Sequence, residues 1–456
     1  MARSSRIQLL RGVAAATFVA AVLAGCSDAA AAPNATSAPL ASAVSAAPAD
    51  SSPIRIGVVL PLTGMPAALA GQERLGIQLA ADLANSDGGV KGRQIELDVR
   101  DLSDSSQAAS VVSQIEAEGA PVVMGSYASD LSMDVSSAAA TAGLVYWESG
   151  AVADQLTGRG LPTVFRVGAD GARLGTNSAT FAATVLAPRL GRTASSLRVT
   201  IVAANDDYAA SVADAAQAGL AAEGSILAGR IDYSLSDPNW SAVLKQLVAS
   251  RPDVVILAAH ILDGEAFRRA MIADGVHVGA LIGSTMAQCV NDFGEELGAD
   301  AIGVFASDRP TGGFNPQALE PAARALYDRF AAVWAANDPG QPTEEGLAGF
   351  SAAWALFHYV LPEATTLDPA SIAAAARAVD LPEGSLPNGS GLRFSTDPAR
   401  LGQNELAAAV VWQWQPAAPG TTVDGDDGPT AAQSVTVWPA QFASGEIDPA
   451  LVPLPR

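Results

Sequence analysis

Short apolar runs alternate along this chain with longer stretches in which apolar residues recur at helical spacing. The first run, Ile54–Leu60, is uninterrupted and rich in β-branched residues, which is typical of a strand buried on both faces. In residues 69–85, which follow, Leu75, Leu79 and Leu83 fall on one helical face. Similar runs predict strands at 94–100, 121–124, 144–147, 163–167, 198–203, 226–233, 253–259, 280–283 and 302–306, and helices at 104–118, 173–187, 207–223, 239–249, 263–274 and 289–298. The alternation predicts an α/β fold of βαβ units with doubly wound parallel sheets.

The last third of the chain is more irregular. Helices are predicted at 319–337 and 344–360, and their aromatic residues are expected in the core: Trp334, Phe350, Trp354 and Phe357. Two closing strands, 406–414 and 434–437, flank a loop rich in glycine and aspartate.

The charge balance narrows the choice of partners. The 456 residues contain 26 Lys+Arg and 47 Asp+Glu, a formal net charge of −21. Such acidity argues against a nucleic-acid partner, whose phosphates would be repelled. The three histidines show no zinc-motif spacing, so a histidine-rich metal site is not expected. A binding function would need no cofactor, and none is expected.

The N-terminus has the composition of an export signal. Arg3, Arg6 and Arg11 precede an uncharged apolar run at 12–25, which is too short to span a bilayer comfortably. The run ends in Leu23-Ala24-Gly25-Cys26, which resembles a bacterial lipobox. We therefore expect a signal peptide at 1–25, lipidation of Cys26, a flexible tether at 26–52 and an extracytoplasmic protein anchored to the cell membrane. The alternative is an ordinary signal peptide with an incidental cysteine.

No catalytic motif is recognisable. The sequence contains neither a Gly-x-Ser-x-Gly elbow nor a Gly-x-x-x-x-Gly-Lys-Ser/Thr loop. Gly88-Gly89-Val90-Lys91-Gly92 ends a predicted helix and therefore indicates a turn, not a phosphate-binding loop. The acidic pairs Glu295-Glu296, Glu344-Glu345 and Asp426-Asp427 are expected to be solvated. These observations favour a binding protein, although an active site assembled from distant residues stays open.

The run Ile56-Gly57-Val58-Val59-Leu60-Pro61-Leu62-Thr63-Gly64 resembles the opening strand of type I periplasmic binding proteins of the Leu/Ile/Val-binding family. Gly71-Gln72-Glu73, the segment 76–80 and Gly88-Gly89-Val90-Lys91-Gly92 continue the pattern at family spacing. The resemblance extends to Val437-Trp438-Pro439 and so covers residues 54–439.

This resemblance implies two doubly wound parallel-sheet lobes joined by three crossover strands, closing on a small molecule. The crossings are expected near 168–171, 306–310 and 401–406. Lobe one would comprise 54–169 plus 308–402, and lobe two 170–307 plus 403–456.

Two loops of lobe one match the family's ligand-binding positions. Ser129, at the start of a predicted helix at 130–142, matches the serine that bonds the ligand, and Tyr127 resembles the aromatic of amide-binding relatives. Alternatively, Ser129 only caps its helix. The second loop would contribute Trp147 as a stacking platform, with Ser149, Gly150, Ala151 and Val152 beside it. Alternatively, Trp147 is a core residue.

Lobe two would contribute Tyr208, His260 and Thr285, each after a predicted strand. Alternatively, His260 has only a hydrogen-bonded structural role. Amino-acid-binding relatives carry an acid at the position of Thr285 and a hydroxyl at that of Val152. These departures favour a neutral or amide-like ligand, although Glu148 or Asp207 could replace the missing counter-ion.

The function implied is that of a lipid-anchored substrate-binding protein, which delivers a small polar solute to an ABC importer permease by hinge closure. The solute would be a branched-chain amino acid, an amide or a related molecule. A ligand-sensing receptor of the same fold is the first alternative, and a secreted enzyme ranks below both.

Overall fold

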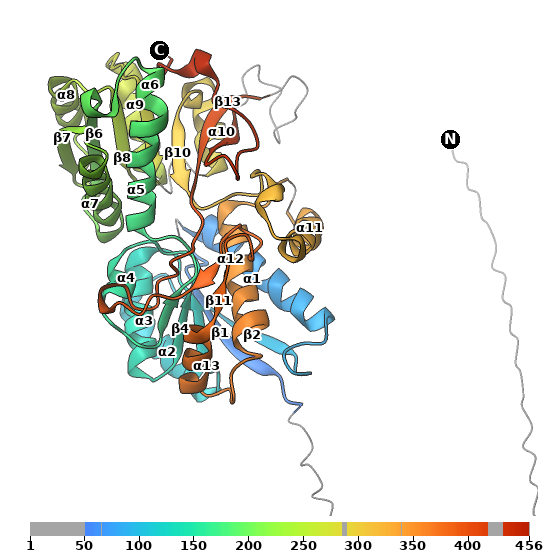
Figure 1. Cartoon of the computed structure of the whole chain (residues 1–456). Helices are drawn as coiled ribbons and strands as arrows, with labels where there is room; N and C mark the ends of the chain where they lie inside the picture. The colour runs from blue at the N-terminus through green and yellow to red at the C-terminus, as the bar shows by residue number, and fades with distance from the viewer. Residues whose placement is uncertain (1–50, 65, 285–289, 339, 418–431, 456) are drawn as a thin grey trace, which may run out of the picture. The chain divides into compact units, whose positions relative to one another are not determined.

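The computed structural model describes residues 51–64, 66–284, 290–338, 340–417 and 432–455 (Figure 1). The predicted signal peptide at 1–25, the lipidation site Cys26, nearly all of the tether and the site residue Thr285 lie outside the described residues.

The first sheet is fully parallel and has the strand order β2-β1-β3-β4-β5. Its strands are β1 Ile54–Leu60, β2 Ile95–Asp101, β3 Val122–Gly125, β4 Val145–Glu148 and β5 Val164–Arg166. The side chains of β3, β4 and β5 are buried on both faces, as their continuous apolar runs predict.

The second sheet repeats this order and extends it, as β14-β13-β10-β9-β8-β6-β7. Its strands are β6 Arg198–Ala204, β7 Ile226–Tyr233, β8 Val254–Ala258, β9 Ala280–Ser284, β10 Phe305–Asp308, β13 Val410–Pro416 and β14 Ala432–Trp438. The strands from β6 to β10 pair in parallel, whereas β13 and β14 are antiparallel. The predicted α/β fold class is confirmed. A short antiparallel pair, β11 Asp380–Leu381 and β12 Leu392–Arg393, stands apart.

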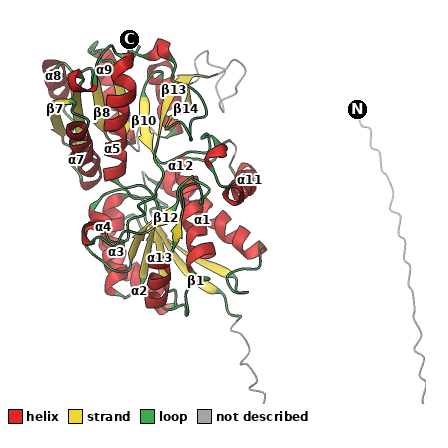
Figure 2. Cartoon of the chain, in the orientation of Figure 1, coloured by secondary structure: helices red, strands yellow, loops and turns green. Residues whose placement is uncertain are grey.

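Helices flank both sheets (Figure 2). They are α1 Ala67–Ser86, α2 Ala108–Ala117, α3 Ser129–Thr141, α4 Gln155–Gly158, α5 Gly171–Phe181, α6 Ala187–Arg189, α7 Asp207–Ala222, α8 Trp240–Ser250, α9 Ile261–Ala273, α10 Asn291–Leu297, α11 Pro321–Ala335, α12 Glu344–Trp354 and α13 Pro369–Ala378. Several begin where the sequence supplies a capping side chain, such as Asp170 before α5 and Asp206 before α7. None of these helices, within the described ranges, has both the length and the apolarity to cross a bilayer.

Glycine contacts bring α1 against α12. A Cβ on Gly76 would lie 2.0 Å from the Gly346 carbonyl oxygen, and one on Gly349 would lie 2.4 Å from the Glu73 carbonyl oxygen. Only glycine permits two helix backbones to approach so closely. The contact joins two distant parts of the sequence and places Glu73 beside the start of α12.

Two predicted strand boundaries need correction. The strand predicted at 302–306 begins only at Phe305, because the chain turns at Gly303, where φ is +92°. The strand predicted at 406–414 begins at Val410. The helix predicted at 344–360 keeps those bounds, with α12 followed by a π-helical segment, Ala355–Val360. Helix α13 was not predicted, although Asp368-Pro369 is a capping signal for its start.

The two predicted lobe boundaries stay a prediction, but the strands divide in a compatible way. Strands β1 to β5 make the first sheet, and β6 to β10 with β13 and β14 make the second. Residues Gln403 and Asn404 form bridges to Arg166 and Phe394, so this part of the chain still accompanies the first sheet.

Candidate functional site

The loop after β4, residues 149–154, has its backbone N–H groups bonded within the protein. Gly150 and Ala151 each donate to Glu148 Oε1 at 2.7 Å. Val152 and Ala153 donate to the Ser129 hydroxyl at 3.4 and 3.2 Å. The structure thus brings Ser129 together with Gly150, Ala151 and Val152, which the sequence placed in one site. Their contact with a ligand stays a prediction.

Two buried arginines hold the carbonyl side of the same loop. Arg309 donates from Nη1 to the carbonyl oxygens of Ser149 and Gly150, at 3.1 and 2.8 Å. Arg166 donates from Nη1 to the carbonyl oxygen of Ala153 at 2.7 Å and to that of Ala151 at 3.4 Å. Buried charge-assisted bonds of this kind fix a backbone firmly. The loop is therefore pre-organised.

Arg309 lies in a buried acidic group that we call the Arg309 cluster. Its carboxyl members are Glu73, Glu148, Asp308, Glu344 and Glu345. Arg309 forms an ion pair with Glu344, and its Nε is 3.7 Å from Asp308 Oδ1. Burial alone would lower the pKa of Arg309, but the carboxylates of Glu344 and Asp308 outweigh burial and raise it. The expectation that Glu344 and Glu345 are solvated is wrong, since both are buried.

Glu73 is a strongly perturbed acid of the Arg309 cluster. Its side chain is fully buried, and Oε1 accepts a hydrogen bond from the Ser149 hydroxyl at 2.5 Å. Burial, reinforced by the charge of Glu148, raises the pKa of Glu73 to about 8. Burial likewise raises the pKa of Glu345 to about 7. One arginine does not balance five carboxyl groups, so the cluster holds protons near neutral pH.

Gly150 is packed between Glu73 and Tyr127. A Cβ on Gly150 would lie 2.3 Å from Glu73 Oε2 and 3.0 Å from Tyr127 Cδ2. Tyr127 is itself buried, and burial together with the charges of Glu345 and Glu344 raises its pKa. The predicted site residue Tyr127 therefore lies beside the Arg309 cluster and the loop.

Trp147, a predicted site residue, lies in the core. Its side chain is 0% exposed and packs among Phe165 and Phe394, with ring centroids 5.8 and 5.4 Å away. Its indole N–H donates to the carbonyl oxygen of Ala352 at 2.8 Å. Its burial among these rings and its bonded nitrogen match the alternative, a core residue. Its role as a stacking platform stays a prediction.

The described residues predicted for lobe two lie together at the ends of β8 and β9. The Tyr208 hydroxyl contacts the carbonyl oxygens of Ala259 and Ser284, at 3.0 and 2.8 Å. The ring of His260 meets Tyr208 edge-on, with centroids 5.0 Å apart. Burial opposes protonation of His260, but bonding to Asp263 and the charge of Asp206, 3.3 Å from Nε2, raise its pKa overall.

The loop after β4 also contacts the helices of the second sheet. Asp154 donates its backbone N–H to the Ser211 hydroxyl of α7 at 3.0 Å. In return, Ala172 at the start of α5 donates to Asp154 Oδ1 at 2.9 Å. Ser211 is buried, so α7 packs closely over this loop.

The residues that sequence reasoning missed are Glu73, Glu148 as an acceptor, Arg166 and Arg309. Glu73 belongs to the quoted Gly71-Gln72-Glu73 motif, and Arg309 lies in the expected crossing near 306–310. The motif and the expected crossing were the features of the sequence that could have pointed to Glu73 and Arg309. Among the described residues, no group of three or more histidine, cysteine or acidic side chains is placed to hold a metal ion.

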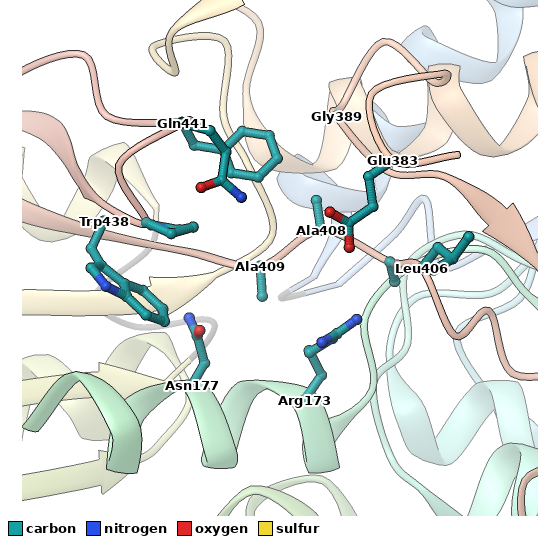
Figure 3. A pocket seen from close by; sticks show the side chains of 12 residues that line it. Arg173, Asn177, Glu383, Gly389, Leu406, Ala408, Ala409, Trp438 and Gln441 are labelled. Atoms are coloured by element: carbon teal, nitrogen blue, oxygen red, sulfur yellow. The ribbon is translucent and has the colours of Figure 1, made fainter. Parts of the chain in front are cut away.

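A separate recess lies between α5 and the chain around residues 383–389, 406–409 and 438–442 (Figure 3). Its volume is about 160 Å³. None of the site residues predicted from the sequence lines it.

Comparison with known proteins identifies the family. Residues 53–410 match the family model described as "Periplasmic binding protein", so the chain belongs to this family, as a type I member of the Leu/Ile/Val-binding group. Leu/Ile/Val-binding protein homolog 8 of Brucella abortus (strain 2308) is 28% identical over 365 residues, covering 79% of this chain and 88% of the relative. Leu/Ile/Val-binding protein homolog 7 of Brucella melitensis is 27% identical over 410 residues, covering 88% and 95%.

Solved structures of low sequence identity share the fold. The leucine-binding protein LivK of Thermotoga maritima has a TM-score of 0.66 at 20% identity, covering 79% of this chain and 95% of LivK. LivJ of Streptococcus pneumoniae, in complex with isoleucine, has a TM-score of 0.63 at 19% identity, covering 84% and 100%. A solute-binding protein of Rhodopseudomonas palustris, in complex with 3,4-dihydroxy benzoic acid, has a TM-score of 0.65 at 16% identity, covering 85% and 97%. The fold thus accommodates ligands of different chemistry.

Proposed function

We propose that this chain is the substrate-binding protein of an ABC importer and binds a small polar solute between its two sheets. The observation that carries the proposal is the loop after β4, held by Arg166 and Arg309 and bonded to Ser129, in a chain that matches the periplasmic binding protein family over 53–410. The relatives named for leucine, isoleucine and valine support a branched-chain amino acid or a related molecule as the solute.

The hydrogen bonds of the loop support a solute without a carboxylate at this position. The N–H groups of Gly150 and Ala151 already bond the Glu148 carboxylate, so a ligand carboxylate would have to displace a buried anion. An amide or another neutral group avoids that cost. This consideration favours the amide-like solute within the proposed class.

The mechanism we propose is hinge closure. A ligand that contacts both lobes stabilises the closed arrangement only through contacts that the open arrangement lacks. The predicted lobes, 54–169 plus 308–402 and 170–307 plus 403–456, are the rigid bodies of this proposal. A smaller radius of gyration in solution scattering at saturating solute is expected, and an unchanged radius with tight binding would contradict delivery to a permease.

Replacing Ser129 with alanine is expected to weaken solute binding about three- to tenfold, because one hydrogen bond is worth about 0.5–1.5 kcal/mol. The measurement is calorimetric titration of the full chain with L-leucine, L-isoleucine and L-leucinamide. Thr141→Ala, an exposed position at the other end of α3, is the matched control. Equal affinities of the parent and Ser129→Ala would show that Ser129 does not bond the solute.

We also propose that the protein is held at the outer face of the cell membrane through a lipid on Cys26. Two or more acyl chains suffice for stable anchoring. Cys26→Ala is therefore expected to move the full chain from the membrane fraction to the soluble fraction of fractionated cells. Persistence of the variant in the membrane fraction would contradict a lipid anchor at this residue.

Two other functions are separable by simple observations. A ligand sensor of the same fold would lack permease and ATPase genes beside its own and would bind a signalling partner. A secreted enzyme would convert its bound solute, which mass spectrometry after prolonged incubation would detect.

A further inference from the structure

The recess between α5 and the segment 406–409 combines features of a small binding site (Figure 3). Its volume of about 160 Å³ is below the roughly 300–1,000 Å³ typical of pockets for drug-sized ligands, so only a small molecule fits. It is lined by Arg173, Asn177, Glu383, Gly389, Leu406, Ala407, Ala408, Ala409, Trp438, Pro439, Gln441 and Phe442.

Two opposite charges face this recess without pairing. Figure 3 shows Arg173 on α5 and Glu383 on the opposite wall pointing toward one another. Within the described part of the chain, neither side chain takes part in an ion pair. Arg173 bonds the carbonyl oxygen of Glu405 through Nη2 at 2.9 Å, which fixes the guanidinium at the rim. A guanidinium presents several donors, so Arg173 keeps donors for an anion.

The opposite end of the recess is apolar and aromatic. Ala408 and Ala409 are each only 9% exposed and add little bulk to the wall. The Trp438 ring lies beside them and packs against Phe181 with centroids 6.0 Å apart. Asn177 is anchored through Nδ2 to the Ser307 hydroxyl at 3.2 Å. The Asn177 and Gln441 amides also point into this end (Figure 3), so it suits a short chain that is largely apolar.

We propose that this recess binds a small zwitterion with an apolar side chain. Its carboxylate would bond Arg173, its ammonium group would bond Glu383, and its apolar part would lie against Trp438 and Ala409. A zwitterion can pair with both of these charges across the recess, whereas a singly charged molecule can pair with only one. This site is distinct from the proposed solute site, since it shares no residue with the loop after β4 or with Ser129.

The test uses three matched probes and the fluorescence of Trp438 in the full chain. The probes are L-leucine, 4-methylpentanoate, which lacks the ammonium group, and isopentylamine, which lacks the carboxylate. L-leucine is expected to give a saturable change in emission that is lost in Trp438→Phe, with the other two probes at least about tenfold weaker. Arg173→Met and Glu383→Gln should each weaken the L-leucine response by about tenfold or more.

The controls separate this site from the proposed solute site. Arg189→Met and Glu363→Gln remove exposed charges elsewhere and should leave the response unchanged. Ser129→Ala should also leave it unchanged, whereas a response that follows Ser129 belongs to the solute site and overturns the inference. The inference is also overturned if the emission change persists in both Arg173→Met and Glu383→Gln. It is equally overturned if L-leucine gives no saturable change up to about 10 mM.

Discussion

Replacing Arg309 with methionine is expected to lower the free energy of unfolding at pH 7 by about 3–5 kcal/mol. Arg309 pairs with Glu344, lies beside Asp308 and donates to the carbonyl oxygens of Ser149 and Gly150. Methionine preserves much of the packing volume but leaves a buried carboxylate without its cation and two carbonyl oxygens without their donor. Breaking a buried ion pair on one side costs far more than the intact pair contributes.

Denaturant unfolding of the full chain, followed by tryptophan fluorescence, measures this loss. The control is Arg329→Met, because Arg329 pairs with Asp87 at 2.9 Å where the two side chains are 44% and 48% exposed. Exposed pairs contribute about 0–1 kcal/mol. A loss in Arg309→Met no larger than that of the control would show that the Arg309 cluster does not need its cation.

The loss in Arg309→Met should also grow with pH. Without the cation, the buried carboxyl groups hold protons in the folded chain that the unfolded chain has already released. Stability falls with rising pH wherever the folded state binds more protons. The difference between Arg309→Met and the parent is therefore expected to be smaller at pH 5 than at pH 8.

The strands were predictable from sequence because each is a local pattern. The run 226–233 has the bounds of β7, and the run 54–60 has those of β1, since both end at turns that the sequence marks. The segment 406–409 misled because its apolar residues continue into β13 without a break, although sheet pairing begins only at Val410. Which part of an apolar run pairs depends on the partner strand, and the run itself does not encode that.

The candidate site was predictable only in part, for a related reason. Ser129 and the loop after β4 came from short motifs, and the structure brings them within hydrogen-bond distance. The Arg309 cluster draws on residues 73, 148, 308, 344 and 345, which no local pattern joins. Glu344-Glu345 looked like a solvated pair because burial of two acids requires a cation from elsewhere in the chain, here Arg309.

Trp147 shows that the same limit of sequence-based prediction applies to an apolar residue. A tryptophan at the carboxyl end of a parallel strand can face a ligand or the core, and the sequence is the same in both cases. The neighbours that decide the matter are Phe165, Phe394 and the carbonyl of Ala352, all distant in sequence. The apolar run predicted the strand at 144–147, but it does not say which neighbours the Trp147 side chain meets.

Glu73→Gln is expected to destabilise the folded chain at low pH and to stabilise it at high pH. The folded chain holds a proton on Glu73 up to a pKa of about 8, whereas the unfolded chain releases it near the ordinary value of 4.5. Between these values the folded state binds more protons, so this residue makes the parent less stable as pH rises. At about 1.4 kcal/mol per pKa unit, the total over this range is at most about 5 kcal/mol.

Glutamine removes this titration but introduces an amide. Its oxygen can still accept from the Ser149 hydroxyl, while its NH₂ takes the place of Oε2, which has no hydrogen-bond partner. The protonated acid of the parent already places one O–H donor there, whereas the amide NH₂ places two, and each buried donor without an acceptor costs about 1–3 kcal/mol. Glu73→Gln should therefore be less stable than the parent at pH 5 and more stable at pH 9. Denaturant unfolding across this pH range, with Glu116→Gln on the exposed side of α2 as control, measures both differences. A difference between variant and parent that stays constant from pH 5 to 9 would mean that Glu73 carries no proton in the folded chain.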